Sequence, residues 1–251
     1  MRFHFLSSQA EAAQEARQLL IDRYGQSDPK ECDVAVSIGG DGQLLDSLVA
    51  VGSEKPVFGL NRGTIGFLLN EYRLDGLIER VSSARRVTIH PLRMRATGVD
   101  GQVKEALAFN EVALFRETSQ AAHIAIDVDG VRRMERLICD GVLLATPAGS
   151  TAYNLSAHGT IIPLRSRLMG LTPISAFRPR RWRGALLPDN AEVTFDVLDP
   201  VKRPVAATAD STEFRDCAKV SVTMDFDKSY HLLFDADQAL EERILQEQFE
   251  G

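Results

Sequence analysis

The sequence has few cysteines, and they are scattered. Among its 251 residues only Cys32, Cys139 and Cys217 are cysteines, and long stretches separate them. Their spacing fits neither a disulfide framework nor a zinc motif. The five histidines do not pair at metal-ligand spacings either. We therefore expect a cytoplasmic protein with reduced thiols and without a zinc site.

Two further absences exclude classes of partner. No apolar run approaches the roughly 18 residues that a membrane span needs, and the stretch Met1–Leu6 is too short for a signal peptide. The formal net charge is −6, so the chain has no overall basic field to attract nucleic acid. We expect a globular protein that binds neither membranes nor nucleic acid.

The first third of the chain alternates short apolar runs with helical patterns. The strand candidates are Phe3–Leu6, Val34–Ile38 and Pro56–Leu60, and helical spacing of apolar residues follows each of the first two. Such alternation is typical of βαβ units and a parallel sheet. We predict an α/β domain with a Rossmann-like sheet over residues 1–85.

The pattern changes near residue 86. Apolar and polar residues then alternate with period two, and Val99–Gln102 and Asp129-Gly130 are hairpin turn signals. Residues 86–234 are therefore predicted to form a mostly β domain, which we expect to be sandwich-like. Asp237–Phe249 is helical in pattern, and we expect residues 235–251 to pack back on the first domain.

The first unusual motif is Gly39-Gly40-Asp41-Gly42, which joins a buried strand candidate to a helical pattern. This layout offers backbone N–H groups to a phosphate at a helix N-terminus. A carboxylate is repelled by phosphate, so Asp41 is expected either to hold a metal or to accept a proton. A tight turn with a polar tip is the structural alternative.

A second motif, Asn110-Glu111, interrupts the apolar stretch Leu107–Phe115. Neighbours on a strand point to opposite faces, so one of the two side chains faces the core unless a bulge intervenes. A glutamate suits the adjacent hydroxyls of a ribose, and an asparagine can bind a base edge. A solvent-facing bulge on an edge strand is the alternative.

The third motif follows Asp140. The apolar run Val142–Ala145 ends in small residues and hydroxyls, Thr146–Thr151, which can approach a ligand closely. Tyr153 is able to stack on a base, although a lone tyrosine is more often a core or interface residue.

Two other features have less specific interpretations. Arg178–Arg183 is a basic loop in an acidic chain; it could steer an anionic substrate, but a solvated or subunit-contact loop fits equally, and we leave it out of the predicted site. Asp210 ends a strand candidate and is, alone, typical of a turn.

Together these motifs resemble the NAD kinase family over nearly the whole chain. The glycine turn alone is shared with phosphofructokinases and diacylglycerol kinases, but the order of all the blocks is specific. The blocks that carry the resemblance are Gly39–Gly42, Gly59–Asn61, Gly63–Leu68, Asn110-Glu111, Asp140–Ala157 and Thr172–Ile174.

The resemblance implies ATP-dependent phosphorylation of the adenosine ribose 2′-hydroxyl of NAD, which gives NADP, with polyphosphate as a further candidate donor. It also implies a site between an α/β domain and a β domain, a divalent metal such as Mg²⁺, and a homodimer or homotetramer. A related lipid or sugar kinase and a non-catalytic NAD(P)-binding sensor are the alternatives. The Asn110-Glu111 pair argues against the first, and Asp41 against the second.

The resemblance also assigns residues. Asp41 is implied as the proton acceptor, and no protein ligand to the metal is assigned. The implied substrate contacts are Asp41, Gly42, Asn110, Glu111, Asp140, Thr151, Ala152, Tyr153, Asn154, Leu155, Ser156 and Asp210. The sequence departs from the family pattern at Gln43, at His158–Thr160 and at Ser211, which all lie at motif edges and bear on substrate preference.

Overall fold

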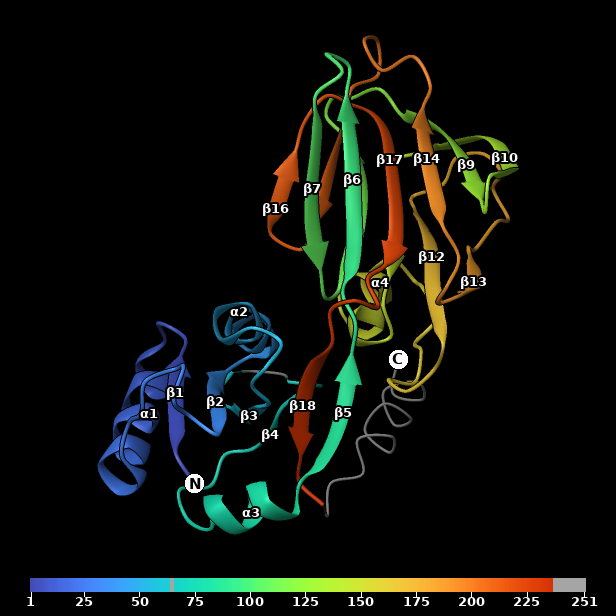
Figure 1. Ribbon diagram of the computed structural model, residues 1–251. Helices are drawn as coiled ribbons and strands as arrows, with labels where there is room; N and C mark the ends of the chain where they lie inside the picture. Colours follow the sequence, from blue (N-terminus) through green and yellow to red (C-terminus); the bar gives the residue numbers. More distant parts are fainter. Residues whose placement is uncertain (64–65, 237–251) are drawn as a thin grey trace. The chain divides into compact units, whose positions relative to one another are not determined.

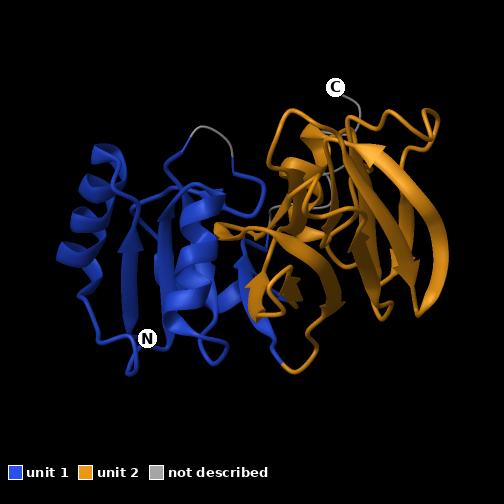
Figure 2. Ribbon diagram, turned by 90° about the horizontal axis from the view of Figure 1, so that it is seen from above, with its two compact units in different colours: residues 1–89, 228–251 blue, residues 90–227 orange. Residues whose placement is uncertain are grey.

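The chain forms two compact units in a computed structural model that describes residues 1–63 and 66–236. Unit 1 comprises Met1–Ile89 and Lys228–Gly251, and unit 2 comprises His90–Asp227 (Figure 2). The helix that the sequence predicts over Asp237–Phe249 lies outside the described residues. No helix in the described ranges is long and apolar enough to cross a membrane.

Unit 1 is an α/β domain built on one six-stranded sheet. The sheet has the order β1-β2-β3-β18-β5, and β4 pairs with β3. Strands β1, β2, β3 and β18 run parallel, whereas β5 is antiparallel to β18. The elements are β1 (Phe3–Ser7), α1 (Glu11–Tyr24), β2 (Val34–Gly39), α2 (Asp41–Val51), β3 (Val57–Asn61), β4 (Asn70–Glu71), α3 (Leu77–Ser83), β5 (Arg85–Ile89) and β18 (Tyr230–Phe234).

Strand β2 is the centre of this unit. All six of its residues are buried, as expected for a parallel strand covered on both faces. Alternate residues of β1, Phe3 and Phe5, join the same core, and α1 packs on it through Ala13, Ala16 and Leu20. The predicted α/β organisation with a parallel sheet is confirmed.

Two strands lie in a different unit from the one that the sequence predicts. The sequence placed residues 86–234 in the β domain, but β5 and β18 belong to the sheet of unit 1. Tyr230 pairs with Ile89 and Phe234 with Arg85, so the pairing joins segments far apart in sequence. The buried side chain of Asn70 fixes this return by donating to the carbonyls of Gly59 and Leu233, each at 3.0 Å.

Unit 2 contains two six-stranded antiparallel sheets. Their orders are β10-β9-β14-β17-β6-β7 and β13-β12-β11-β8-β15-β16 (Figure 1). The elements are β6 (Leu92–Gly98), β7 (Val103–Ala108), β8 (Glu111–Arg116), β9 (Ala122–Val128), β10 (Val131–Cys139), β11 (Gly141–Ala145), η1 (Ala148–Thr151), α4 (Tyr153–Ser156), β12 (Leu168–Ile174), β13 (Ala185–Pro188), β14 (Val193–Val197), β15 (Val205–Ala209), β16 (Thr212–Phe214) and β17 (Cys217–Met224).

One hydrophobic core joins the two sheets of unit 2. Met94 and Phe195 from the first sheet lie in the same buried cluster as Val112 and Leu144 from the second. Two antiparallel sheets that share one core form a sandwich. The predicted β-rich second domain is confirmed, although its first strand starts at Leu92.

Candidate functional site

The glycine turn of unit 1 lies where β2 ends and α2 begins. Gly40 precedes the helix, and Asp41 is its first residue. The loop after β3 packs onto this turn: the N–H of Arg62 donates to the carbonyl of Gly39 at 2.9 Å. A Cβ atom on Gly63 would lie 3.2 Å from the Cα of Gly40, closer than most Cβ contacts, so a side chain there would push the two loops apart by a few tenths of an ångström.

The carboxylate of Asp41 is fixed by the same loop. Its Oδ2 accepts the backbone N–H of Phe67 at 2.9 Å, and its Oδ1 accepts that of Leu68 at 3.0 Å. The side chain is therefore held in one direction and is not the loose polar tip of a turn. Each carboxylate oxygen has more than one lone pair, so Asp41 retains acceptor capacity for a substrate hydroxyl.

Asn110 and Glu111 lie where the chain changes sheets. The stretch predicted as one interrupted strand is two strands: β7 ends at Ala108 in one sheet, and β8 begins at Glu111 in the other. Strand β8 pairs with β11 on one side and with β15 on the other. The alternative of a solvent-facing bulge on an edge strand is therefore wrong.

Asp210 holds the backbone of this crossing. Its carboxylate accepts N–H groups from Phe109 at 2.6 Å, Asn110 at 3.0 Å and Glu111 at 3.2 Å. Asp210 has a φ of 47°, as expected for a tight turn after β15, but its side chain does more than form that turn. It positions the two residues that the sequence assigns to ribose and base.

The side chain of Glu111 is largely buried, and one of its carboxylate oxygens lacks a hydrogen-bond partner among the described residues. Its Oε2 is buried and has no hydrogen bond within the described structure. Burial raises the pKa of Glu111 to about 7, and the charge of Asp210 adds to this effect. A buried acceptor left without a donor is uncommon in folded proteins, and a ribose hydroxyl is a donor of the right kind.

Glu111 lies on the outer face of the second sheet, away from the shared core. Ala113 and Phe115 follow Glu111 at every second position of β8 and so point to the same face. Their pairing partners on β11 are Leu143 and Gly141. The ring of Tyr153 packs on Phe115, with centroids 5.7 Å apart and planes tilted by 31°. Burial raises the pKa of Tyr153, and the charges of Glu111 and Asp140 contribute. The negative charges of both carboxylates therefore act on the Tyr153 hydroxyl.

The segment after β11 folds tightly against Asn110. The hydroxyl of Thr146 donates to the carbonyl of Phe109 at 2.6 Å, and its N–H donates to the carbonyl of Asn110 at 2.9 Å. A Cβ atom on Gly149 would lie 2.1 Å from the carbonyl oxygen of Asn110, so this close approach requires glycine. The third motif therefore packs directly against Asn110 of the second motif.

The side chain of Asn154 forms hydrogen bonds inside the protein. Its side chain is fully buried. The amide nitrogen donates to the carbonyls of Ser150 at 3.1 Å and Thr160 at 3.0 Å, and Oδ1 accepts the hydroxyl of Thr172 at 2.7 Å. Both donor hydrogens are therefore used inside the protein. Within the described structure this side chain shapes the loop, and the substrate contact at Asn154 stays a prediction.

The structure brings most of the predicted site residues together within unit 2. Asn110, Glu111 and Asp210 form one cluster, and the segment 151–156 lies beside it on the outer face of the second sheet. Asp140 is in an ion pair with Arg116 at 2.6 Å and remains partly exposed. The other two predicted residues, Asp41 and Gly42, belong to unit 1.

A pocket of about 330 Å³ adjoins Tyr153 and includes residues that the sequence prediction left out. It is lined by Tyr153, Ser156, Ala157, His158, Pro173, Ile174, Ser175, Ala176, Arg180, Trp182 and Arg183. The basic loop therefore contributes to the surroundings of the predicted dinucleotide residues. The concentration of arginine in this loop of an acidic chain is the sequence feature that could have placed the loop in the predicted site.

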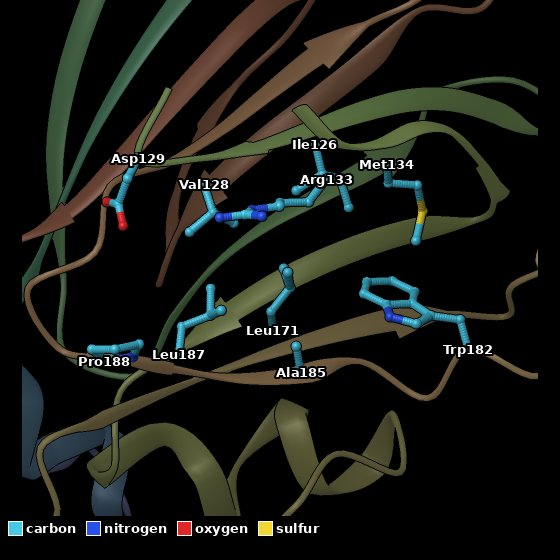
Figure 3. A pocket seen from close by; sticks show the side chains of 10 residues that line it. All are labelled: Ile126, Val128, Asp129, Arg133, Met134, Leu171, Trp182, Ala185, Leu187 and Pro188. Atoms are coloured by element: carbon cyan, nitrogen blue, oxygen red, sulfur yellow. The ribbon is translucent and has the colours of Figure 1, made fainter. Parts of the chain in front are cut away.

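Trp182 also lines a second, larger pocket of about 430 Å³ (Figure 3). Its walls are mainly apolar and include Ile126, Met134 and Leu171, with Arg133 among the few charged side chains. None of the predicted site residues lines it, and an apolar lining does not match a dinucleotide. We place the candidate site at the first pocket and at Glu111.

Comparison with known proteins identifies the family of this chain. The ATP-NAD kinase N-terminal domain model matches residues 3–80, and the ATP-NAD kinase C-terminal domain model matches residues 109–230. The NAD kinase of Caulobacter vibrioides is 55% identical over 249 residues, which cover 99% of this chain and 96% of the relative. That of Hyphomonas neptunium is 52% identical over 250 residues, covering 99% and 98%.

Solved structures show the same fold. A yeast NADH kinase complexed with NADH superposes with a TM-score of 0.86 at 20% identity, covering 100% of this chain and 87% of the other. An NAD kinase from Archaeoglobus fulgidus in complex with ATP gives a TM-score of 0.76 at 21% identity, with 98% of each chain covered. From the two matching domain models and the full-length relatives, this chain belongs to the NAD kinase family.

Proposed function

We propose that this chain is an NAD kinase that transfers the γ-phosphoryl group of ATP to the 2′-hydroxyl of the adenosine ribose of NAD, which yields NADP and ADP. The observation that carries the assignment is the buried Oε2 of Glu111, which has no hydrogen-bond partner among the described residues. Asp210 holds the backbone N–H of the same residue, on the face that carries Tyr153. Full-length relatives that are NAD kinases support the same reaction.

Unit 2 supplies the groups for the acceptor. Glu111 accepts a hydrogen bond from a ribose hydroxyl, which satisfies its unpartnered Oε2. The ring of Tyr153 stacks on the adenine, and Asn110 binds a base edge. Thr151, Ala152, Leu155 and Ser156 belong to the same short segment, η1 and α4, and complete the proposed nucleotide contacts.

Unit 1 supplies the proton acceptor and part of the donor site. The 2′-oxygen attacks the γ-phosphorus, the bond from that phosphorus to the bridging oxygen of ADP breaks, and the hydroxyl proton passes to Asp41. The N–H groups of Phe67 and Leu68 keep the carboxylate in position for this transfer. The N-terminal N–H groups of α2, beginning at Asp41 and Gly42, attract the phosphates of ATP.

The described residues include no group of three or more histidine, cysteine, aspartate or glutamate side chains that could hold a metal ion. Mg²⁺ commonly binds through substrate phosphates with one or two carboxylates, and we propose that it enters with ATP.

Assembly and location are further proposals. The resemblance to the family supports a homodimer or homotetramer, which light scattering on the purified protein tests. The three free cysteines are all buried, which is compatible with reduced thiols in the cytoplasm.

The experiment that tests the function measures NADP formation with a coupled dehydrogenase, using ATP or polyphosphate as donor and NAD, a sugar or a lipid as acceptor. We expect NADP from ATP and NAD. Transfer to the sugar or the lipid without NADP would favour the related kinases. NAD binding without any transfer would favour the non-catalytic sensor.

A further inference from the structure

The predicted dinucleotide face of unit 2 is acidic, although its ligand is an anion. Glu111, Asp140 and Asp210 all lie on or beside it. The guanidinium of Arg116 is already paired with Asp140, with Nε and Oδ1 2.6 Å apart. The diphosphate bridge of a dinucleotide carries two negative charges, which this face repels. A separate source of positive charge is needed beside Tyr153.

Two arginines of the basic loop are placed to supply that charge. Arg180 and Arg183 line the pocket that also contains Tyr153 and Ser156. Both are exposed, and neither forms an ion pair with any residue in the described part of the chain. No carboxylate among the described residues therefore neutralises their charge. Arg181, between them in sequence, does not line the pocket.

The loop also orients one of these arginines. The guanidinium carbon of Arg180 lies 5.3 Å from the centroid of the Phe177 ring. Stacking on an aromatic ring limits the freedom of an arginine while its N–H donors stay available. Arg180 is therefore partly ordered before a ligand binds.

We propose that Arg180 and Arg183 form the subsite for the diphosphate bridge of the dinucleotide, next to Tyr153. The inference rests on the proposed function and names two specificity-determining residues for it. Guanidinium groups bind phosphate oxygens through paired, charge-assisted hydrogen bonds. The subsite favours acceptors with a diphosphate over a plain nucleoside, because only the diphosphate uses both arginines.

The test compares Arg180→Gln and Arg183→Gln with the matched control Arg181→Gln. NAD affinity is measured by titration calorimetry and by the fluorescence of Trp182, the single tryptophan of the sequence and a wall of this pocket. Each pocket variant is expected to weaken NAD and ADP-ribose binding by about tenfold or more. It should raise KM for NAD and leave kcat nearly unchanged, and Arg181→Gln should match the wild type.

Two further readouts separate charge recognition from general damage. The inhibition constant of adenosine, which lacks phosphate, should be the same in all four proteins. The NAD affinity of the wild type should fall more steeply with added salt than that of the pocket variants, because each variant makes one phosphate contact fewer. The melting temperature of each variant checks that the exposed loop substitution has not unfolded the chain.

The proposal is overturned if Arg180→Gln and Arg183→Gln bind NAD as tightly as Arg181→Gln, or if they weaken adenosine and NAD equally. Failure of the proposed function looks different. In that case the wild type forms no NADP from ATP and NAD, while the calorimetric comparison of NAD, ADP-ribose and adenosine still decides whether the arginines bind a diphosphate.

Discussion

The carboxylate of Asp210 accepts a hydrogen bond from the backbone N–H of Glu111 at 3.2 Å, although the two residues are 99 positions apart. The same carboxylate accepts the N–H groups of Phe109 and Asn110. One side chain thus fixes the backbone at the point where the chain crosses between sheets. This explains how the Asn110-Glu111 pair is held in one geometry.

Asp210→Asn is expected to destabilise the protein by about 1–3 kcal/mol, because the amide has one acceptor oxygen where the carboxylate has two. At least one N–H of residues 109–111 then loses its partner. Urea unfolding measures the change. The matched control is Asp216→Asn, since Asp216 also has a positive φ, 53°, but its carboxylate accepts no hydrogen bond from the described residues. Equal stability of the two variants would refute the positioning role.

The raised pKa of Glu111 predicts that the stability of the ligand-free protein depends on pH. Burial and the Asp210 charge raise its pKa from 4.5 to about 7 in the folded state. The folded chain therefore binds this proton more tightly than the unfolded chain does. Its stabilising contribution is complete below pH 4.5 and is lost as the pH rises towards 7, by an amount on the order of 3 kcal/mol.

Glu111→Gln isolates this contribution, because its side chain has nearly the same shape and does not titrate. The difference between the unfolding free energies of wild type and variant should decline between about pH 4.5 and 7 and stay level above. Parallel curves across this range would contradict the burial of a titrating carboxyl group. The same variant is expected to weaken NAD binding, since a glutamine amide is a weaker acceptor for a ribose hydroxyl than a carboxylate is.

Asn154 and Ser156 separate a structural role from a ligand-binding role within one short segment. Asn154→Ala removes three buried hydrogen bonds and should lower the free energy of unfolding by about 2–4 kcal/mol. Ser156 is exposed and lines the pocket beside Tyr153, so Ser156→Ala should keep full stability and raise KM for NAD. Chemical unfolding and steady-state kinetics on both variants check this. A stable Asn154→Ala protein with a raised KM would favour a direct substrate contact over this structural role.

Local patterns in the sequence were sufficient for much of this fold. Buried apolar runs such as Val34–Ile38 predict parallel strands, and the glycines around Asp41 predict a turn at a helix start. Both depend on neighbours in sequence, where periodicity and turn chemistry are informative.

Contacts between distant segments were beyond such reasoning. The pairing of β18 with β5 joins residues about 140 positions apart and moves both strands into unit 1. The sheet change at Asn110 depends on the carboxylate of Asp210, which alone resembles an ordinary turn residue. Arg180 and Tyr153 line the same pocket, which forms only when the chain folds. Single-sequence patterns carry no signal for such partners.

The most direct test of the account is the rate of NADP formation by Asp41→Asn with saturating ATP and NAD. The amide is unable to accept the hydroxyl proton, so kcat should fall by about a hundredfold to ten-thousandfold, while NAD affinity stays near that of the wild type. The control is Asp46→Asn, an exposed position on the same helix, which should keep full activity. Near-normal turnover by Asp41→Asn, with an unchanged pH profile, would contradict the proposed mechanism.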